Sequence, residues 1–255
     1  METNFSIPEF FYDLIAILFP GIFTLGVGYL IFPEILVSLI ETYPYLNNIF
    51  IFLFIAYIIG HISYSLSSEI IAPTFNFLSG NPTKTLLGKE IKKRQKNFNK
   101  YFLREVIEHD DYFTKNVKKG IEKYTDYKNF DFSKGENIDI GYEFCRNFIV
   151  EKASKNYTSI RKEQSYGELS RSIILITLLF AIGMIITQII SGSISFFWIK
   201  LGINLIVLLS FVFRYGQARH TAPIFIFSTF CTFLEVSNFE QKENKKQKNK
   251  KKAKK

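Results

Sequence analysis

The first 83 residues of this 255-residue chain contain no lysine or arginine, and all 32 basic side chains lie at or beyond Lys84. Long stretches of the chain also lack acidic residues. The mean hydropathy of +0.09 therefore averages very apolar segments with very polar ones. Uncharged runs of more than about 18 residues are typical of membrane-spanning helices, so an ordinary soluble domain is excluded as the leading interpretation.

Cysteine and histidine are also scarce, which limits the chemistry available to the chain. The two cysteines, Cys145 and Cys231, lie in no CxxC pair, so they predict two reduced, buried thiols and no disulfide framework. The three histidines are dispersed, and no zinc site of ordinary spacing can be assembled from them locally. We therefore expect no catalytic residue, no metal and no cofactor, and the chain is not predicted to be an enzyme.

Four apolar segments predict an all-α membrane protein with four transmembrane helices. The first two helices cover about residues 10–32 and 47–68, and the third and fourth share residues 172–213. About 20 helical residues, at a rise of about 1.5 Å each, cross the hydrocarbon core of a bilayer. The sequence Ser191-Gly192-Ser193 predicts the turn between the last two helices.

The distribution of basic residues predicts how these helices are oriented. Residues 84–171 contain 20 lysines and arginines, and the segment after Gln241 contains nine lysines. Basic residues that flank membrane spans are retained on the cytoplasmic side, so both segments and both termini are predicted to be cytoplasmic. The two short hairpin loops, which contain no basic residue, are predicted to face outward.

The polar part of the sequence predicts a helical cytoplasmic domain inserted between helices two and three. Pro73 and a turn at residues 79–82 are expected to end the second helix. Phe113, Val117 and Ile121 recur at every fourth residue, as on the buried face of a helix, whereas residues 127–141 are polar and predict a loop. The predicted organisation comprises transmembrane helices one and two at 1–72, the cytoplasmic domain at 73–170, transmembrane helices three and four at 171–213, a cytoplasmic C-terminal helix at 214–240 and a disordered lysine-rich tail at 241–255.

Two ionisable residues, Asp13 and His61, fall inside predicted spans, where a charge is costly unless it is paired or faces a polar cavity. Asp13 lies near the cytoplasmic end of the first span, level with Arg171 and Arg214 at the ends of spans three and four. A structural ion pair is the simplest interpretation. The alternative is an ion or proton path that would also include His61 and Gln188.

Small residues predict where helices approach closely. Pro20 and Gly21 lie in the middle of the first span, and Ala56 and Gly60 form a small-xxx-small pair on the second. Proline interrupts the hydrogen-bond ladder of a helix and glycine permits close packing, so a kinked and tightly packed first helix is expected. The interface could lie within one subunit or between subunits.

Two basic features leave a nucleic-acid partner open. Arg214 and His220 fit the Arg-x(4–6)-His spacing of one group of helical ribonucleases, although an arginine at a membrane exit also snorkels to lipid phosphate. The lysine tail could contact anionic lipid, bind nucleic acid non-specifically or remain solvated. It contains no interleaved aromatic residues, which argues against base stacking.

The segment Phe11-Tyr12-Asp13-Leu14-Ile15-Ala16, followed by Phe19-Pro20-Gly21, resembles the opening of a group of small, mostly uncharacterised bacterial multi-span membrane proteins. Gly60-His61-Ile62 and Arg171 at the start of the third span are also similar to that group. The resemblance covers about half of the chain. It implies a multi-pass protein of the bacterial inner membrane, and some such proteins are accessories or effectors of antiphage systems, including CRISPR-linked ones.

The leading functional hypothesis is a non-enzymatic effector or accessory of antiviral defence. In this hypothesis the cytoplasmic domain receives a signal and the spans permeabilise the membrane as a homo-oligomer, because one bundle with so few polar residues has no evident aqueous lumen. The alternatives are a membrane-anchored scaffold that recruits a soluble partner or nucleic acid, and a small transporter. The expected partners are membrane lipids, further copies of the chain and a soluble defence-system protein.

Overall fold

The computed structural model describes the backbone of residues 7–88, 92–100, 111–125, 130–132, 135–152, 154–192 and 194–252; the side chains at 7–10, 13, 94, 135, 154–156, 191 and 237–252 lie outside that description. Every secondary-structure element in these ranges is helical. Four segments are long and apolar enough to cross a membrane: Leu14–Ile31, Ile49–Leu86, Tyr157–Ile190 and Phe197–Val236. The prediction of an all-α, multi-pass membrane protein is confirmed at this level.

Four helices, α1, α3, α8 and α9, have 25 to 56 residues and are longer than the rest. The elements, in chain order, are α1 Ile7–Ile31, α2 Pro33–Thr42, the 3₁₀ helix η1 Pro44–Asn47, α3 Ile49–Ser79, α4 Pro82–Leu86, α5 Lys93–Phe98, α6 Asp111–Tyr124, α7 Gly135–Lys152, α8 Ser154–Ser191 and α9 Phe197–Lys252.

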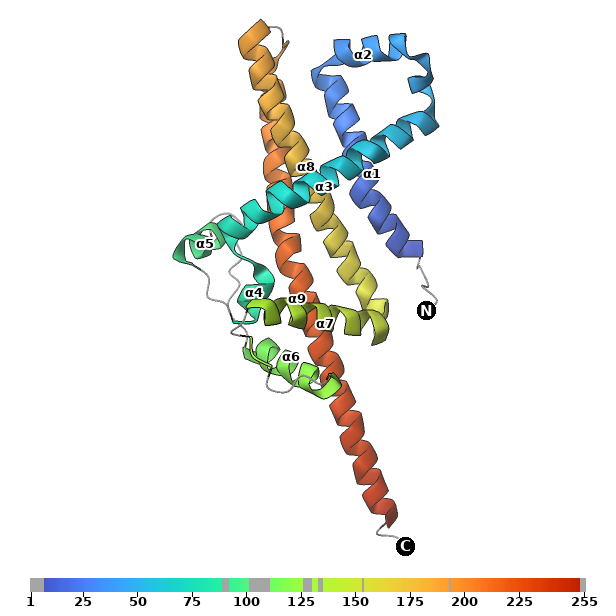
Figure 1. Ribbon diagram of the computed structural model, residues 1–255, viewed down its shortest axis with the longest axis vertical. Helices are drawn as coiled ribbons and strands as arrows, with labels where there is room; N and C mark the ends of the chain where they lie inside the picture. Colours follow the sequence, from blue (N-terminus) through green and yellow to red (C-terminus); the bar gives the residue numbers. More distant parts are fainter. Residues whose placement is uncertain are drawn as a thin grey trace.

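The long helices form a bundle around α8 (Figure 1). α8 and α9 are antiparallel partners, α1 packs beside α8, and α3 crosses both α1 and α8 obliquely. α8 ends at Ser191, as the turn sequence predicts, and Gly192 follows with a φ of 59° that favours glycine. α2 and η1 connect α1 to α3 at the same end of the bundle as the α8–α9 turn.

α3 is longer than the second predicted span, because Pro73 does not end it. The helix continues through Pro73 to Ser79 and ends at Gly80, which has a φ of 82° and whose amide donates to the carbonyl of Asn76. A proline removes one backbone hydrogen bond, and a helix packed against neighbours tolerates that loss. The left-handed conformation at Gly80 cannot continue a helix, so the glycine sets the boundary.

α1 and α3 cross at backbone distance. A Cβ atom added to Gly21 would overlap the carbonyl group of Ala56, and one added to Gly60 would overlap the carbonyl group of Ile17. Gly60 and Ala56 are buried, as is Gly21. The small residues therefore form an interface within one subunit, which is one of the two arrangements that the sequence leaves open.

A second packed region lies away from the α8–α9 turn, where α4, α6 and α7 pack against the C-terminal half of α9 (Figure 1). We call its buried side chains the aromatic core: Leu86, Leu87, Val117, Ile121, Phe130, Phe132, Ile138, Cys145, Ile149, Ile160, Ile226, Phe227, Phe230, Cys231 and Leu234. Phe230 of α9 is fully buried and contacts the rings of Phe144 and Phe148 on α7, with centroid distances of 5.7 and 5.2 Å. We refer to α4, α6, α7 and this part of α9 as the helical module.

Two predicted boundaries differ from the structure. α7 begins at Gly135, within the predicted loop 127–141, because Ile138 is buried in the aromatic core and Glu136 lies in the first turn, where a carboxylate complements the helix dipole. The predicted C-terminal helix 214–240 is not a separate element but the continuation of the fourth span. α9 also remains helical to Lys252, within the segment predicted to be disordered, since lysine, glutamine and glutamate are good helix formers.

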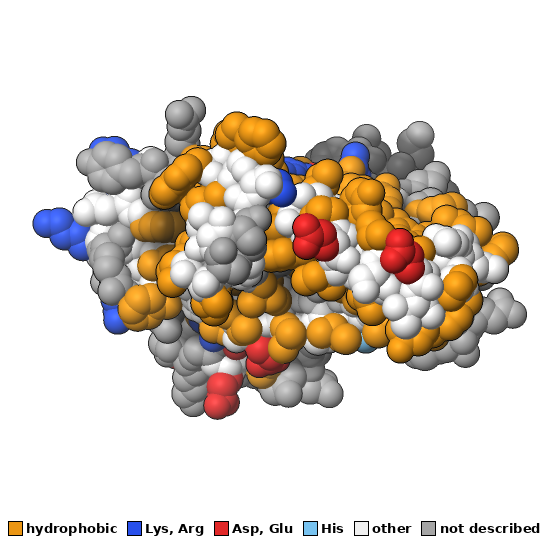
Figure 2. Space-filling model, turned by 90° about the horizontal axis from the view of Figure 1, so that it is seen from above, with side chains coloured by type: hydrophobic (Ala, Val, Ile, Leu, Met, Phe, Trp, Pro, Cys, Tyr) orange, Lys and Arg blue, Asp and Glu red, His pale blue; other side chains and the backbone are white. Residues whose placement is uncertain are grey.

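The bundle presents apolar side chains outward. Hydrophobic atoms cover most of the end that carries α2, with few charged side chains among them (Figure 2). Phe50, Ile190 and Trp198 each expose 79% of their surface. Contiguous apolar surface of this extent is unfavourable in water and typical of helices that contact lipid.

Candidate functional site

The two arginines of the predicted intramembrane ion pair each contact other side chains in the structure. Arg214 on α9 contacts the carboxylate of Glu163 on α8 at 3.0 Å, and its guanidinium lies 5.0 Å from the centre of the Tyr166 ring. Arg171 donates from Nε to Oγ of Ser67 on α3 at 3.2 Å. The side chain of Asp13 lies outside the described residues, so its pairing with either arginine stays a prediction.

The residues of the alternative ion path are not brought together. His61 is exposed on α3 and stacks on the rings of Tyr57 and Tyr64 of the same helix, at centroid distances of 6.2 and 6.4 Å. α3 meets α8 where Ser67 lies 3.4 Å from Ser172. Gln188 is sixteen residues beyond that contact, about 24 Å along the helix axis. His61 lies six residues before Ser67 on α3, no contact among the described residues joins it to Gln188, and the ion path stays a prediction.

The ribonuclease-like pair is also separated. Arg214 is partly exposed, whereas His220 is 1% exposed. Six residues advance the helix direction by about 600°, which places the two side chains on different faces of α9. The structure does not assemble them into one accessible site, and no group of three metal-ligating side chains occurs in the described parts of the chain.

A polar cavity of about 300 Å³ instead lies where α7, α8 and α9 meet. We call it the arginine pocket, because four of its lining residues are arginines and two are glutamates. Its lining comprises Tyr142, Arg146, Arg161, Glu163, Gln164, Gly167, Glu168, Arg171, Tyr215, Ala218, Arg219, Ala222 and Pro223. This pocket contacts both the helical module and the ends of the apolar segments.

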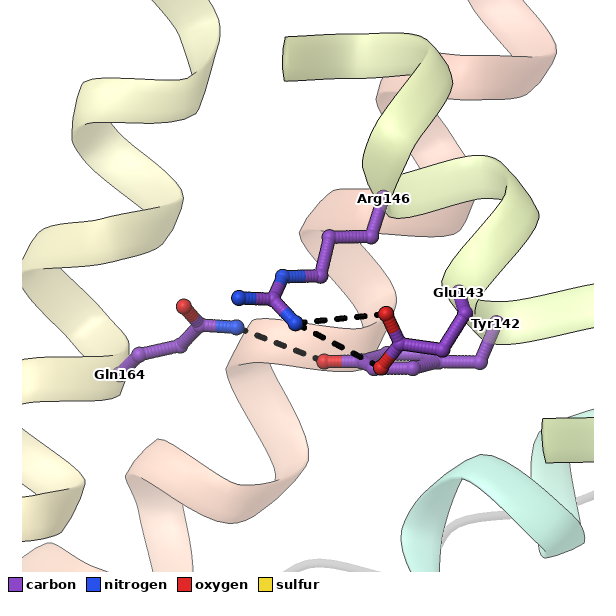
Figure 3. Close-up of polar contacts among 4 residues, drawn as sticks. All are labelled: Tyr142, Glu143, Arg146 and Gln164. Carbon is purple, nitrogen blue, oxygen red and sulfur yellow. Dashed lines mark hydrogen bonds and ion pairs between the residues drawn. The ribbon is translucent and has the colours of Figure 1, made fainter. Parts of the chain in front are cut away.

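A hydrogen bond across the pocket ties α7 to α8 (Figure 3). The amide of Gln164 on α8 donates to the hydroxyl of Tyr142 on α7 at 3.4 Å, and Arg146 contacts the carboxylate of Glu143 at 3.3 Å beside it. Burial raises the pKa of Tyr142, although the bond from Gln164 and the charge of Arg146 oppose the rise. The phenol therefore stays protonated at neutral pH.

Two pocket arginines are held without a carboxylate. Arg219 donates to Oγ of Ser79 at 3.0 Å and to the carbonyl oxygen of Gly80 at 3.2 Å, so it caps the C-terminal end of α3. Arg171 uses Ser67 and lies 5.2 Å from the centre of the Tyr64 ring. Arg161, in contrast, contacts Glu168 at 3.3 Å. Neither Arg171 nor Arg219 has an acidic partner within the described part of the chain.

The sequence identified Arg171 of the lining, and Arg214, which pairs with the lining residue Glu163, but not the other pocket residues. A signal was present, because Arg161, Gln164, Glu168 and Arg171 are spaced by three, four and three residues. That spacing places polar side chains on one face of the helix that enters the third span. Arg146, Tyr142 and Arg219 come from other helices, and only the packing of α7 and α9 against α8 brings them to this face.

Comparison of the chain with protein-family models, with curated proteins and with solved structures finds no match. The resemblance to small bacterial membrane proteins therefore stays a prediction, and the functional argument depends on the geometry of the arginine pocket and of the helices around it.

Proposed function

We propose that the chain is a multi-pass protein of the bacterial inner membrane in which the helical module, on the cytoplasmic side, receives a signal and the spans respond by perturbing the membrane. The observation that carries this proposal is the continuity of α8 and α9. Each helix extends without a break from an apolar segment into the helical module. A rigid helix that is shifted at one end moves at the other, as in known switching transitions.

The module is well suited to move these helices. Its aromatic core includes side chains from α6, α7, α8 and α9, so a displacement of α7 acts directly on both long helices. The arginine pocket lies between α7, α8 and α9 and provides a polar site at which a signal could act. Packed interfaces of this kind shift between discrete arrangements more readily than they deform continuously.

Membrane permeation by this protein would require several copies. The apolar segments of α1, α3 and α9 have most of their residues outside the interior of the single chain, and their exposed side chains are hydrophobic. We therefore propose homo-oligomerisation through these faces, and the role in antiviral defence follows only from the sequence resemblance.

The proposal is tested by breaking the continuity of α8. Insertion of two glycines after Ser170 should uncouple the module from the third span, whereas the same insertion after Gly192, in the α8–α9 turn, should not. We expect expression of the wild type to lower the membrane potential, measured with a voltage-sensitive dye, and the Ser170 insertion to abolish this effect at equal membrane abundance. Equal depolarisation by both insertions would contradict the proposal.

A membrane-anchored scaffold is the second candidate, favoured by the lysine-rich extension of α9 beyond the module. A scaffold needs its spans only as anchors. Exchange of the apolar parts of α1 and α3 for unrelated apolar helices should preserve scaffold function but abolish depolarisation. Scaffold function that is retained after this exchange would establish the scaffold and exclude the effector.

A further inference from the structure

Arginines outnumber acidic side chains in the lining of the arginine pocket. Four arginines and two glutamates line it. Glu168 contacts Arg161 at 3.3 Å, and Glu163 contacts Arg214 on the adjoining turn of α9 at 3.0 Å. Both lining carboxylates are thus engaged, which leaves Arg171 and Arg219 without acidic partners among the described residues. A partly buried charge that lacks an opposite charge is unfavourable, so this site favours an added anion.

The two arginines also retain hydrogen-bonding capacity. A guanidinium has five N–H donors in a planar fork. Arg219 engages Ser79, Asn76 and the carbonyl of Gly80, and Arg171 engages Ser67 and the hydroxyl of Tyr215. These contacts hold the guanidinium groups in place without using all of their donors. Preorganised arginines of this kind match the paired oxygens of a phosphate group.

The pocket lies at the level where a lipid headgroup would be found. Residues 172–191 of α8 are uncharged and span about 30 Å, and Arg171 immediately precedes them. On α3, residues 49–68 are likewise uncharged and Glu69 follows, and Ser67 of α3 contacts Arg171. Tyr64 and Tyr215 lie beside the same arginines, as aromatic residues do at a membrane interface.

We propose that the arginine pocket binds a phosphate group, supplied by the headgroup of an anionic phospholipid or by a soluble phosphate compound. Basic pockets between transmembrane helices bind anionic headgroups in this way. Arg171 of α8, Arg219 of α9 and Arg146 of α7 all line this pocket, so a bound phosphate would connect these helices. This inference rests on the proposed function for the position of the pocket in the membrane, and it adds the class of ligand that the pocket binds.

The test uses the full-length protein in nanodiscs and measures binding directly. One arm compares retention of phosphatidylglycerol with that of phosphatidylcholine by native mass spectrometry. The other arm measures binding of inorganic pyrophosphate by calorimetry in nanodiscs of phosphatidylcholine alone. The variants are Arg171→Gln, Arg219→Lys and Glu168→Gln. Lys200→Gln is the matched control, because it removes one basic charge near the other end of the apolar segments.

We expect Arg171→Gln to weaken phosphate binding about tenfold, and Arg219→Lys, which keeps the charge but loses the fork, to weaken it less. Glu168→Gln removes a competing acid and should strengthen binding, a gain that loss of folding cannot imitate. Lys200→Gln should bind as the wild type does. Selective binding of phosphatidylglycerol identifies the lipid source, and binding of pyrophosphate identifies the soluble source.

Two outcomes would overturn the inference. One is an absence of binding in both arms by the folded wild type. The other is an equal change in Arg171→Gln and Lys200→Gln, which would indicate general charge attraction and no specific pocket. This experiment does not measure membrane potential. If the protein binds no phosphate, the proposed function is still tested by the glycine insertions. If the protein does not depolarise the membrane, the binding result still stands.

Discussion

The α1–α3 crossing and the aromatic core hold helices together by opposite means. At the crossing, Gly21 and Gly60 have no side chains, and the two backbones touch. In the aromatic core, Phe227 and Phe230 are fully buried, and their rings contact those of α6 and α7. One interface therefore depends on the absence of side-chain volume and the other on its presence.

The proposed topology, with the crossing in lipid and the aromatic core in water, accounts for this difference. Lipid tails are as apolar as leucine, so burial of an apolar side chain between spans yields little free energy, and close van der Waals contact is what stabilises a helix pair. In water, removal of large aromatic surfaces is the dominant favourable effect. Substitutions that reduce volume should thus damage the aromatic core, and substitutions that add volume should damage the crossing.

The largest expected effect is that of Phe230→Ala. Removal of this fully buried ring should lower the free energy of unfolding of the helical module by about 4 kcal/mol, because it loses apolar burial and leaves a cavity. Limited proteolysis of the protein in detergent would measure the loss. Trp198, the single tryptophan, lies on the bundle, so its fluorescence should not change. Phe225→Ala, which truncates a partly exposed ring of the same helix, should have a much smaller effect.

Gly21→Leu should have the next largest effect, through the crossing. The added side chain meets the backbone of Ala56, which cannot move aside as a flexible side chain would, and we expect a loss of about 3 kcal/mol. Gly26→Leu is the matched control on the same helix, because a Cβ atom there meets nothing within 4 Å. Thermal denaturation in detergent would compare the two variants. Equal stability would show that the crossing tolerates separation and that the proposed contrast with the aromatic core is wrong.

A smaller effect is expected at the boundary between the two regions. Glu163→Gln removes the carboxylate that contacts Arg214 between α8 and α9, and should lower stability by about 1 kcal/mol, since the pair is partly exposed. Glu143→Gln removes the carboxylate of a pair within one helix and should change stability less. The midpoints of thermal denaturation, measured at low and high salt, would separate them. A difference in midpoint between the two variants that persists in high salt would indicate that packing and not charge is responsible.

The smallest effect at neutral pH is expected for the buried thiol. Burial raises the pKa of Cys145 well above its ordinary value of 9.0, and Cys231 adds to the rise. Above pH 9 the unfolded chain loses this proton while the folded protein keeps it, so the stability contributed by the neutral thiol declines as pH rises. Cys145→Ala should show a weaker decline between pH 8 and pH 10 in thermal denaturation. Rapid reaction of both cysteines with maleimide in the folded protein at pH 7 would contradict their burial.

The sequence predicted the four apolar helices well, because each contains an uninterrupted apolar run and because Ser191 and Gly192 mark a turn. Two predictions were wrong: that Pro73 helps to end the second helix, and that residues 127–141, where α7 begins, form a loop. A proline has a strong local preference that packing overrides, and Ile138 becomes a core residue only when the aromatic core exists. The orientation of the helices remains a prediction from the basic residues.

The candidate site was predictable only in part. Arg171 and Arg214 stand out because each adjoins a long apolar run. The other pocket residues occur in a polar sequence where charges are common, and their function depends on which of them face the same cavity. Arg219, for example, is one of two arginines on α9, and its contact with the end of α3 joins residues 140 positions apart. Such a contact is set by the angle at which α3 crosses the bundle, which no local pattern encodes.

The α1–α3 crossing also bears on how the protein is made. Both of its helices, together with the loop between them, precede Lys84, the first lysine or arginine of the sequence. The glycine contact requires no residue that follows. The hairpin can therefore close without any of the lysines and arginines that are predicted to fix its orientation, and those residues would decide only which way it faces.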